Sequence, residues 1–162
     1  MGLKELVEVS RRYGGDPRFV LAGGGNTSWK NEENLYIKAS GFPLETIDES
    51  GFVKMDRRKL AEIWDADYPA DPDAREKKAL QDLMAAKAPG EESKRPSVET
   101  LLHEAIGDEY VVHTHPALVN GLTCSVRGEE GMKSLFGDDA IWIPIMNPGY
   151  VLAKAVKHAR EE

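Results

Sequence analysis

The chain has little cysteine, no long apolar run and no excess of basic residues. Its 162 residues include a single cysteine, Cys124, which excludes an intramolecular disulfide framework and any metal site built from several cysteines. No apolar stretch approaches the roughly 18 residues that a membrane span needs, and the first residues lack the apolar segment of a signal peptide. The formal net charge of −7 argues against general binding to nucleic acid or to an anionic membrane surface. We therefore expect a cytoplasmic protein without nucleic-acid or membrane partners.

The length and the hydrophobic patterning predict one α/β domain over residues 1–162. Amphipathic spacing and capping residues predict helices, with Asp56 as one N-cap, over residues 2–13, 56–64, 73–87, 97–106 and 149–160. Short apolar or alternating runs predict strands over residues 19–21, 28–30, 35–38, 51–55, 110–114 and 141–145. Strands interleaved with helices indicate a central sheet covered by helices.

Two histidines separated by one residue form the densest chemical signal in the sequence. His113 and His115 follow two valines at the end of a predicted strand. Side chains at positions i and i+2 of a strand share a face, so both rings could reach one metal ion. Zinc accepts neutral imidazole nitrogens, and catalytic zinc commonly has three protein ligands. Two histidines that share no ligand are an equally open interpretation of this pair alone.

Two further polar segments are weaker signals when each is taken alone. Residues 21–28 contain three consecutive glycines followed by Asn26, so backbone amides there could converge on an anion. This segment matches neither a P-loop nor a dinucleotide-binding fingerprint, and a plain glycine-rich turn explains it as well. In residues 95–103, Ser97 is predicted to cap a helix, with Glu99 in its first turn and His103 one turn later. A lone glutamate at a helix start needs no catalytic role.

Four such motifs follow one another along the chain: Gly25-Asn26-Thr27-Ser28, Lys38-Ala39-Ser40-Gly41, Pro96-Ser97-Val98-Glu99 and His113-Thr114-His115-Pro116. In this order they resemble the class II (zinc-dependent) aldolase/adducin family. The residues of these motifs are most similar to those in the aldolase part of rhamnulose-1-phosphate aldolase/dehydrogenase fusion proteins. The resemblance implies a three-layer α/β/α sandwich around a central, mainly antiparallel sheet.

The resemblance also implies the chemistry and the residues that perform it. It implies cleavage of a ketose 1-phosphate, such as rhamnulose 1-phosphate, to dihydroxyacetone phosphate and an aldehyde. It also implies a homo-oligomer, since family members are commonly tetramers. Zn²⁺ would be held by His113, His115 and Glu99, and Glu99 would also act as general acid/base, which calls for a raised pKa. The substrate phosphate would be bound by neutral donors at Asn26, Ser40, Gly41 and Ser97.

The sequence departs from the family pattern after His115. The family's third zinc-binding histidine lies in a late strand before a glycine, whereas the one later histidine here, His158, lies in a helical pattern. We therefore expect a domain that lacks the last strand and helix of the family. Three alternatives stay open: a pentulose-phosphate 4-epimerase or dehydratase on the same metal site, a non-catalytic adducin-like binding or assembly module, and an inactive aldolase remnant.

Overall fold

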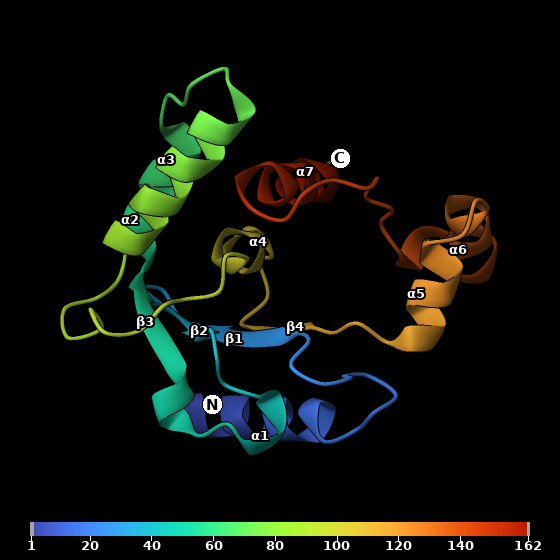
Figure 1. Cartoon of the computed structure of the whole chain (residues 1–162), viewed down its shortest axis with the longest axis horizontal. Helices are drawn as coiled ribbons and strands as arrows, with labels where there is room; N and C mark the ends of the chain where they lie inside the picture. Colours follow the sequence, from blue (N-terminus) through green and yellow to red (C-terminus); the bar gives the residue numbers. More distant parts are fainter. Residues whose placement is uncertain (1, 162) are drawn as a thin grey trace.

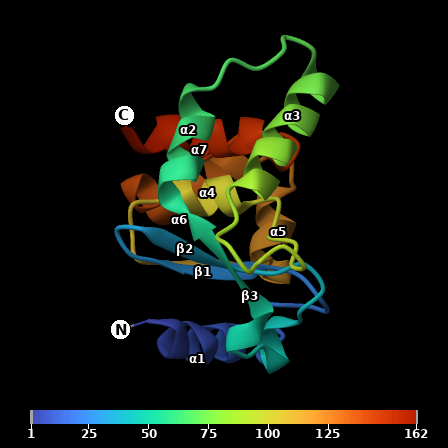
Figure 2. The same ribbon diagram turned by 90° about the vertical axis from the view of Figure 1, so that its left-hand side faces the viewer.

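A central antiparallel sheet separates one helix from most of the others. The computed structural model describes residues 2–161, and its side view shows three layers, with α1 on one face of the sheet and α2, α4 and α7 on the other (Figures 1 and 2). The elements, in chain order, are α1 (Leu3–Gly14), β1 (Asn26–Lys30), β2 (Asn34–Lys38), η1 (Leu44–Thr46), η2 (Glu49–Gly51), β3 (Phe52–Asp56), α2 (Arg57–Asp65), α3 (Pro72–Ala85), α4 (Thr100–Ala105), β4 (Tyr110–His113), α5 (Ala117–Thr123), α6 (Gly128–Phe136), η3 (Gly137–Asp139) and α7 (Tyr150–Glu161).

The strands are ordered β3-β2-β1-β4, and every neighbouring pair is antiparallel. β1 and β2 form a hairpin in which Ser28 faces Ile37. The other side of β1 pairs with β4, and this register places Asn26 opposite His113. Two motifs that lie far apart in the sequence are thereby brought to adjacent positions in the sheet.

Alternation along the strands divides the apolar residues between the two faces of the sheet. Leu35 and Ile37 of β2 belong to the larger cluster, which also takes residues from α2, α3, α4 and α7. Tyr36, between them, packs with Phe52 and with Leu6 of α1 in a smaller cluster on the opposite face. The helices on both sides therefore bury the sheet, as the predicted sandwich requires.

Several predicted elements differ from those observed. Residues 19–21 form turn and loop rather than a strand, since the glycines that follow leave the segment too short to pair. Residues 141–145 are irregular, because Pro144 lacks an amide donor and no described strand runs beside them. The helix predicted over residues 97–106 begins only at Thr100. The helix α6 was not predicted. Asp56 caps α2 as predicted, accepting hydrogen bonds from the amides of Arg58 and Lys59.

No helix within residues 2–161 combines the length and the apolar character needed to cross a membrane.

The close approach of α1 to the backbone of η1 generates a prediction about stability. A Cβ atom added at Gly14 would lie 2.5 Å from backbone atoms of Leu44 and Glu45, whereas one added at Gly121 in α5 meets nothing within 4 Å. We expect Gly14→Ala to lower the free energy of unfolding by about 2 kcal/mol, because the two segments must separate. Gly121→Ala should raise it by roughly 0.5–1 kcal/mol through helix propensity. Urea titrations of both variants measure the difference, and a stabilising Gly14→Ala would contradict the packing described.

Candidate active site

The candidate site forms where the start of β1 meets the end of β4, below the turn that leads into α4. Gly25 precedes β1 with a φ of +76°, and a Cβ at this position would lie 2.5 Å from the carbonyl oxygen of His113. A glycine is therefore needed for the glycine-rich segment to approach the histidine strand so closely. The segment places Asn26, which is 6% exposed, directly beside His113.

Four side chains form a connected polar cluster at this position. The Asn26 amide donates hydrogen bonds to a carboxylate oxygen of Glu99 and, at 3.3 Å, to the hydroxyl of Ser97. The same Glu99 oxygen, Oε2, lies 3.0 Å from Nδ1 of His113. This is an ion-pair distance, although the ring nitrogen is not aligned for a hydrogen bond. The Glu99 amide donates to the Ser97 hydroxyl, which fixes the turn before α4.

The two histidines of the predicted metal pair face each other through their outer nitrogens. Nε2 of His113 and Nε2 of His115 are 2.8 Å apart, and the ring centroids are 4.7 Å apart. His113 is the last residue of β4 and is partly buried, whereas His115 lies beyond the strand and is exposed. The nitrogens that could bind a metal therefore converge on one point at the surface.

Glu99 is ionised at neutral pH in this arrangement. Burial acts to raise the pKa of Glu99, but the contacts with His113 and with the Asn26 amide outweigh it and lower the pKa to about 2. The expectation of a raised pKa is therefore wrong for this structure, because the carboxylate has found a polar partner on each side. As it stands, Glu99 is a proton acceptor.

The residues predicted to bind phosphate lie along two adjacent backbone segments. The Ser40 amide donates to the carbonyl of Arg95 at 2.8 Å, and the Ser97 amide donates to the carbonyl of Lys38 at 3.2 Å. Ser40 and Gly41 are exposed, and the space beside Gly41 is open. No role was predicted for Lys38, which is buried. Burial lowers the pKa of its ammonium group, and the nearby Glu99 carboxylate opposes part of that effect. A lysine at the end of a strand gives no sequence signal of burial.

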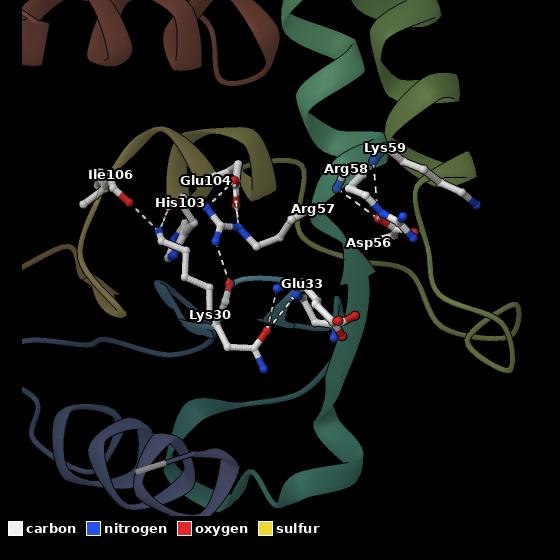
Figure 3. Close-up of polar contacts among 11 residues, drawn as sticks. Lys30, Glu33, Asp56, Arg57, Arg58, Lys59, His103, Glu104 and Ile106 are labelled. Atoms are coloured by element: carbon white, nitrogen blue, oxygen red, sulfur yellow. Dashed lines mark hydrogen bonds and ion pairs between the residues drawn. The ribbon is translucent and has the colours of Figure 1, made fainter.

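A stripe of polar side chains on β1 holds α4 above the sheet. Asn26, Ser28 and Lys30 alternate along the strand and all point toward α4. The Ser28 hydroxyl lies 2.7 Å from Nδ1 of His103. The Lys30 ammonium donates to the carbonyl of His103 at 2.6 Å and to that of Ile106 (Figure 3). Lys30 lies in the strand predicted over residues 28–30, but nothing in the sequence indicates that its ammonium is buried against carbonyls of a distant helix.

Comparison with known families identifies the domain. Residues 4–162 match the class II aldolase and adducin N-terminal domain. The chain belongs to the class II aldolase/adducin family. A solved class II aldolase domain of a conserved Thermoplasma acidophilum protein is 30% identical, with a TM-score of 0.82 over 98% of this chain and 75% of that one. The family and the three-layer fold predicted from the sequence are confirmed.

Two further known proteins are similar to this chain at lower sequence identity. An l-fuculose-1-phosphate aldolase from Thermus thermophilus superimposes with a TM-score of 0.54 at 17% identity, over 99% of this chain and 71% of that one, a likeness of fold alone. The uncharacterized oxidoreductase YuxG of Bacillus subtilis strain 168 is 28% identical over 96% of this chain. The chain spans only 23% of the length of that relative.

The two histidine nitrogens of this class II aldolase domain fit two coordination positions of a divalent metal ion. Zinc bound tetrahedrally keeps neighbouring nitrogens about 3.3 Å apart, so the pair at 2.8 Å needs to open by only about half an ångström. Glu99 meets His113 at Nδ1, the nitrogen through which a carboxylate commonly orients a metal-ligating histidine. In residues 2–161 no group of three or more His, Cys, Asp or Glu side chains is arranged to hold a metal. Direct ligation of the metal by Glu99 stays a prediction. The one histidine that follows His115 in the sequence, His158, lies in α7.

The buried histidine of α4 generates a prediction about acid stability. Burial first, and then His113 and Lys30, lower the pKa of His103 to about 3, and Glu99 only partly opposes them. The unfolded chain, with a pKa near 6.5, binds a proton that the folded protein excludes, so stability falls as the pH decreases from about 6.5 toward 3. This group alone contributes a slope of up to about 1.4 kcal/mol per pH unit.

We therefore expect His103→Asn to have a flatter pH dependence of unfolding between pH 7 and 5 than the wild-type protein. The check is urea unfolding at several pH values, with His158→Asn, changed at an exposed position, as the matched control. Equal slopes for wild type and His103→Asn would contradict the burial of a neutral ring.

Proposed function

We propose that this domain is a metal-dependent sugar-phosphate aldolase that cleaves a ketose 1-phosphate, such as rhamnulose 1-phosphate, to dihydroxyacetone phosphate and an aldehyde. The observation that carries the proposal is the convergence of His113 Nε2 and His115 Nε2 beside the ionised carboxylate of Glu99. Membership of the class II aldolase/adducin family supports this class of reaction. The sugar named comes from the sequence resemblance.

Zn²⁺ is the metal that we propose for the histidine pair. Imidazole nitrogens suit zinc, and His113 and His115 would supply two of its ligands. When bound, the metal would supply Lewis-acid stabilisation of the negative charge that carbon–carbon cleavage leaves on the substrate. Glu99 would hold the His113 ring in place through Nδ1.

Glu99 would move the proton in the proposed reaction. Its carboxylate is the base form at neutral pH, and the Asn26 amide fixes one of its oxygens. In cleavage, a base held in this way can accept the proton of the hydroxyl group that becomes the aldehyde and deliver a proton to the carbon that loses its carbon–carbon bond, next to the carbonyl of dihydroxyacetone phosphate. Aldol addition reverses these two transfers. The same proton chemistry serves a 4-epimerase or a dehydratase, which therefore remain alternative reactions on this site.

The substrate phosphate would lie beside the turn that precedes α4. Ser40 and Ser97 would offer their hydroxyl groups and Gly41 its amide, because the Ser40 and Ser97 amides already donate to carbonyls of the two adjacent segments. Asn26 lies between this turn and His113. Neutral hydrogen-bond donors of this kind can bind a phosphate even in a domain whose net charge is negative. Val98 has no hydroxyl and instead lines an apolar cavity with residues of α3 and α7, so it would not contribute to phosphate binding.

A second candidate is a non-catalytic adducin-like module or an inactive remnant. The observation that favours it is the absence, within the described part of the chain, of a third acidic, cysteine or histidine side chain placed to complete a metal site. Measurements of metal binding and of turnover distinguish the aldolase from the non-catalytic candidate.

We expect the purified chain to bind about one Zn²⁺ and to cleave rhamnulose 1-phosphate or fuculose 1-phosphate. His113→Ala should abolish metal binding measured by calorimetry, because one of the two converging nitrogens is lost. Glu99→Gln should lower kcat by roughly 10²–10⁴-fold, since the proton acceptor is removed.

His158→Ala is the matched control and should retain both metal binding and turnover. Turnover that survives Glu99→Gln would remove the proposed role of the carboxylate. A chain that binds no zinc and cleaves neither sugar phosphate would favour the non-catalytic candidate.

A further inference from the structure

We propose that Ser28, Lys30 and His103 are positioning residues that set the place of the Glu99 carboxylate through α4. The inference rests on the proposed function for its kinetic part and on the geometry alone for the rest. None of the three side chains is required by the chemistry itself. Each belongs to the contact between β1 and α4.

Helix α4 cannot place Glu99 by its own rigidity. It has six residues, Thr100–Ala105, and an isolated helix of that length is not stable in water. Glu99 occupies the N-cap position but makes no side-chain cap, because its carboxylate points away toward Asn26 and His113. The position of this carboxylate therefore depends on whatever holds α4 against the sheet.

Strand β1 holds α4 at its beginning, middle and end. Asn26 contacts Glu99 at the start of α4, and Ser28 contacts His103 in its second half. At the C-terminal end, Lys30 binds the carbonyls of His103 and Ile106, as Figure 3 shows. Carbonyls at the end of a helix lack partners within the helix and carry the negative end of its dipole, so a buried ammonium suits them. β1 pairs on both sides, with β2 and β4, and is thus a firm support.

The contact between Ser28 and His103 is connected to Glu99 through the backbone of α4. His103 is fully buried, its ring centroid lies 6.4 Å from that of His113, and its amide donates to the Glu99 carbonyl at 3.1 Å. A shift of His103 is therefore transmitted to Glu99 through the helix backbone. Misplacing a catalytic group by about 1 Å can cost on the order of 10²-fold in rate, so loosening this contact should reduce kcat.

The test compares variants that loosen α4 with a matched lysine variant. Ser28→Ala removes one hydroxyl, and Lys30→Met removes the charge while keeping the length of the side chain. Lys59→Met is the control, because Lys59 also donates to a carbonyl at a helix end, but that carbonyl belongs to Ala85 of α3 and not to α4. His103→Leu removes the bond to Ser28, and His103→Asn retains an amide at the position of Nδ1.

The first readout is the side-chain ¹⁵N NMR spectrum of the histidines at one fixed pH, without substrate. The chain has four histidines, so the His113 signals can be assigned from single variants. We expect Ser28→Ala and Lys30→Met to move the His113 signals in the direction that Glu99→Gln moves them, and Lys59→Met to leave them in place.

The second readout is steady-state kinetics of the zinc-loaded protein. We expect kcat to fall by roughly 10–100-fold in Ser28→Ala, Lys30→Met and His103→Leu, with KM changed by less than about 3-fold, because proton transfer is affected more than binding. His103→Asn should recover most of the loss. A purely structural role would lower stability and leave both the His113 signals and kcat unchanged.

Unchanged His113 signals in a folded Ser28→Ala protein would overturn the inference, and this variant decides the outcome if Lys30→Met does not fold. If the wild-type protein has no aldolase activity, the proposed function fails while the NMR comparison still decides whether these residues position Glu99.

Discussion

The polar contact between β1 and α4 is the interaction on which the rest of the site depends. Three alternating side chains of one strand bind a helix too short to be stable alone. Burying so many polar groups is favourable only when they satisfy one another. Here the Lys30 ammonium meets carbonyls and the Ser28 hydroxyl meets an imidazole, whereas Oδ1 of Asn26 and Nε2 of His103 are buried without a hydrogen-bond partner among residues 2–161. The sheet face that carries this stripe is continuous with the apolar cluster of β2 and β3, so the polar contact forms inside a packed core.

Much of the fold and part of the site could be predicted from the sequence. Alternation and capping located β2, β3, α2 and α7 within a few residues. The family resemblance carried by the motif order implied that Asn26, Glu99 and His113 belong to one site. Strand pairing places Asn26 beside His113, and the start of α4 places Glu99 against both. The metal-binding, proton-transfer and phosphate-binding roles of the site residues stay predictions.

Other features had no local signal in the sequence. The burial of Lys30 depends on carbonyls more than seventy residues away, and only the tertiary fold creates that environment. Apolar runs at residues 19–21 and 141–145 looked like strands because β-propensity reflects packing against neighbours that these segments do not have. The low pKa of Glu99 likewise comes from partners supplied by two separate strands, whereas burial by itself acts in the opposite direction.

The position of β4 at the edge of the sheet divides the site into parts of unequal local stability. Asn26 lies on a strand with a neighbour on each side, whereas His113 ends a strand that, within residues 2–161, pairs on one side only. Edge-strand ends open more readily than central strands. Fraying of β4 would separate the histidine pair while the contact between β1 and α4 persists. A ligand that binds both histidines would therefore stabilise the closed strand end, and its affinity would include the free energy of that local folding.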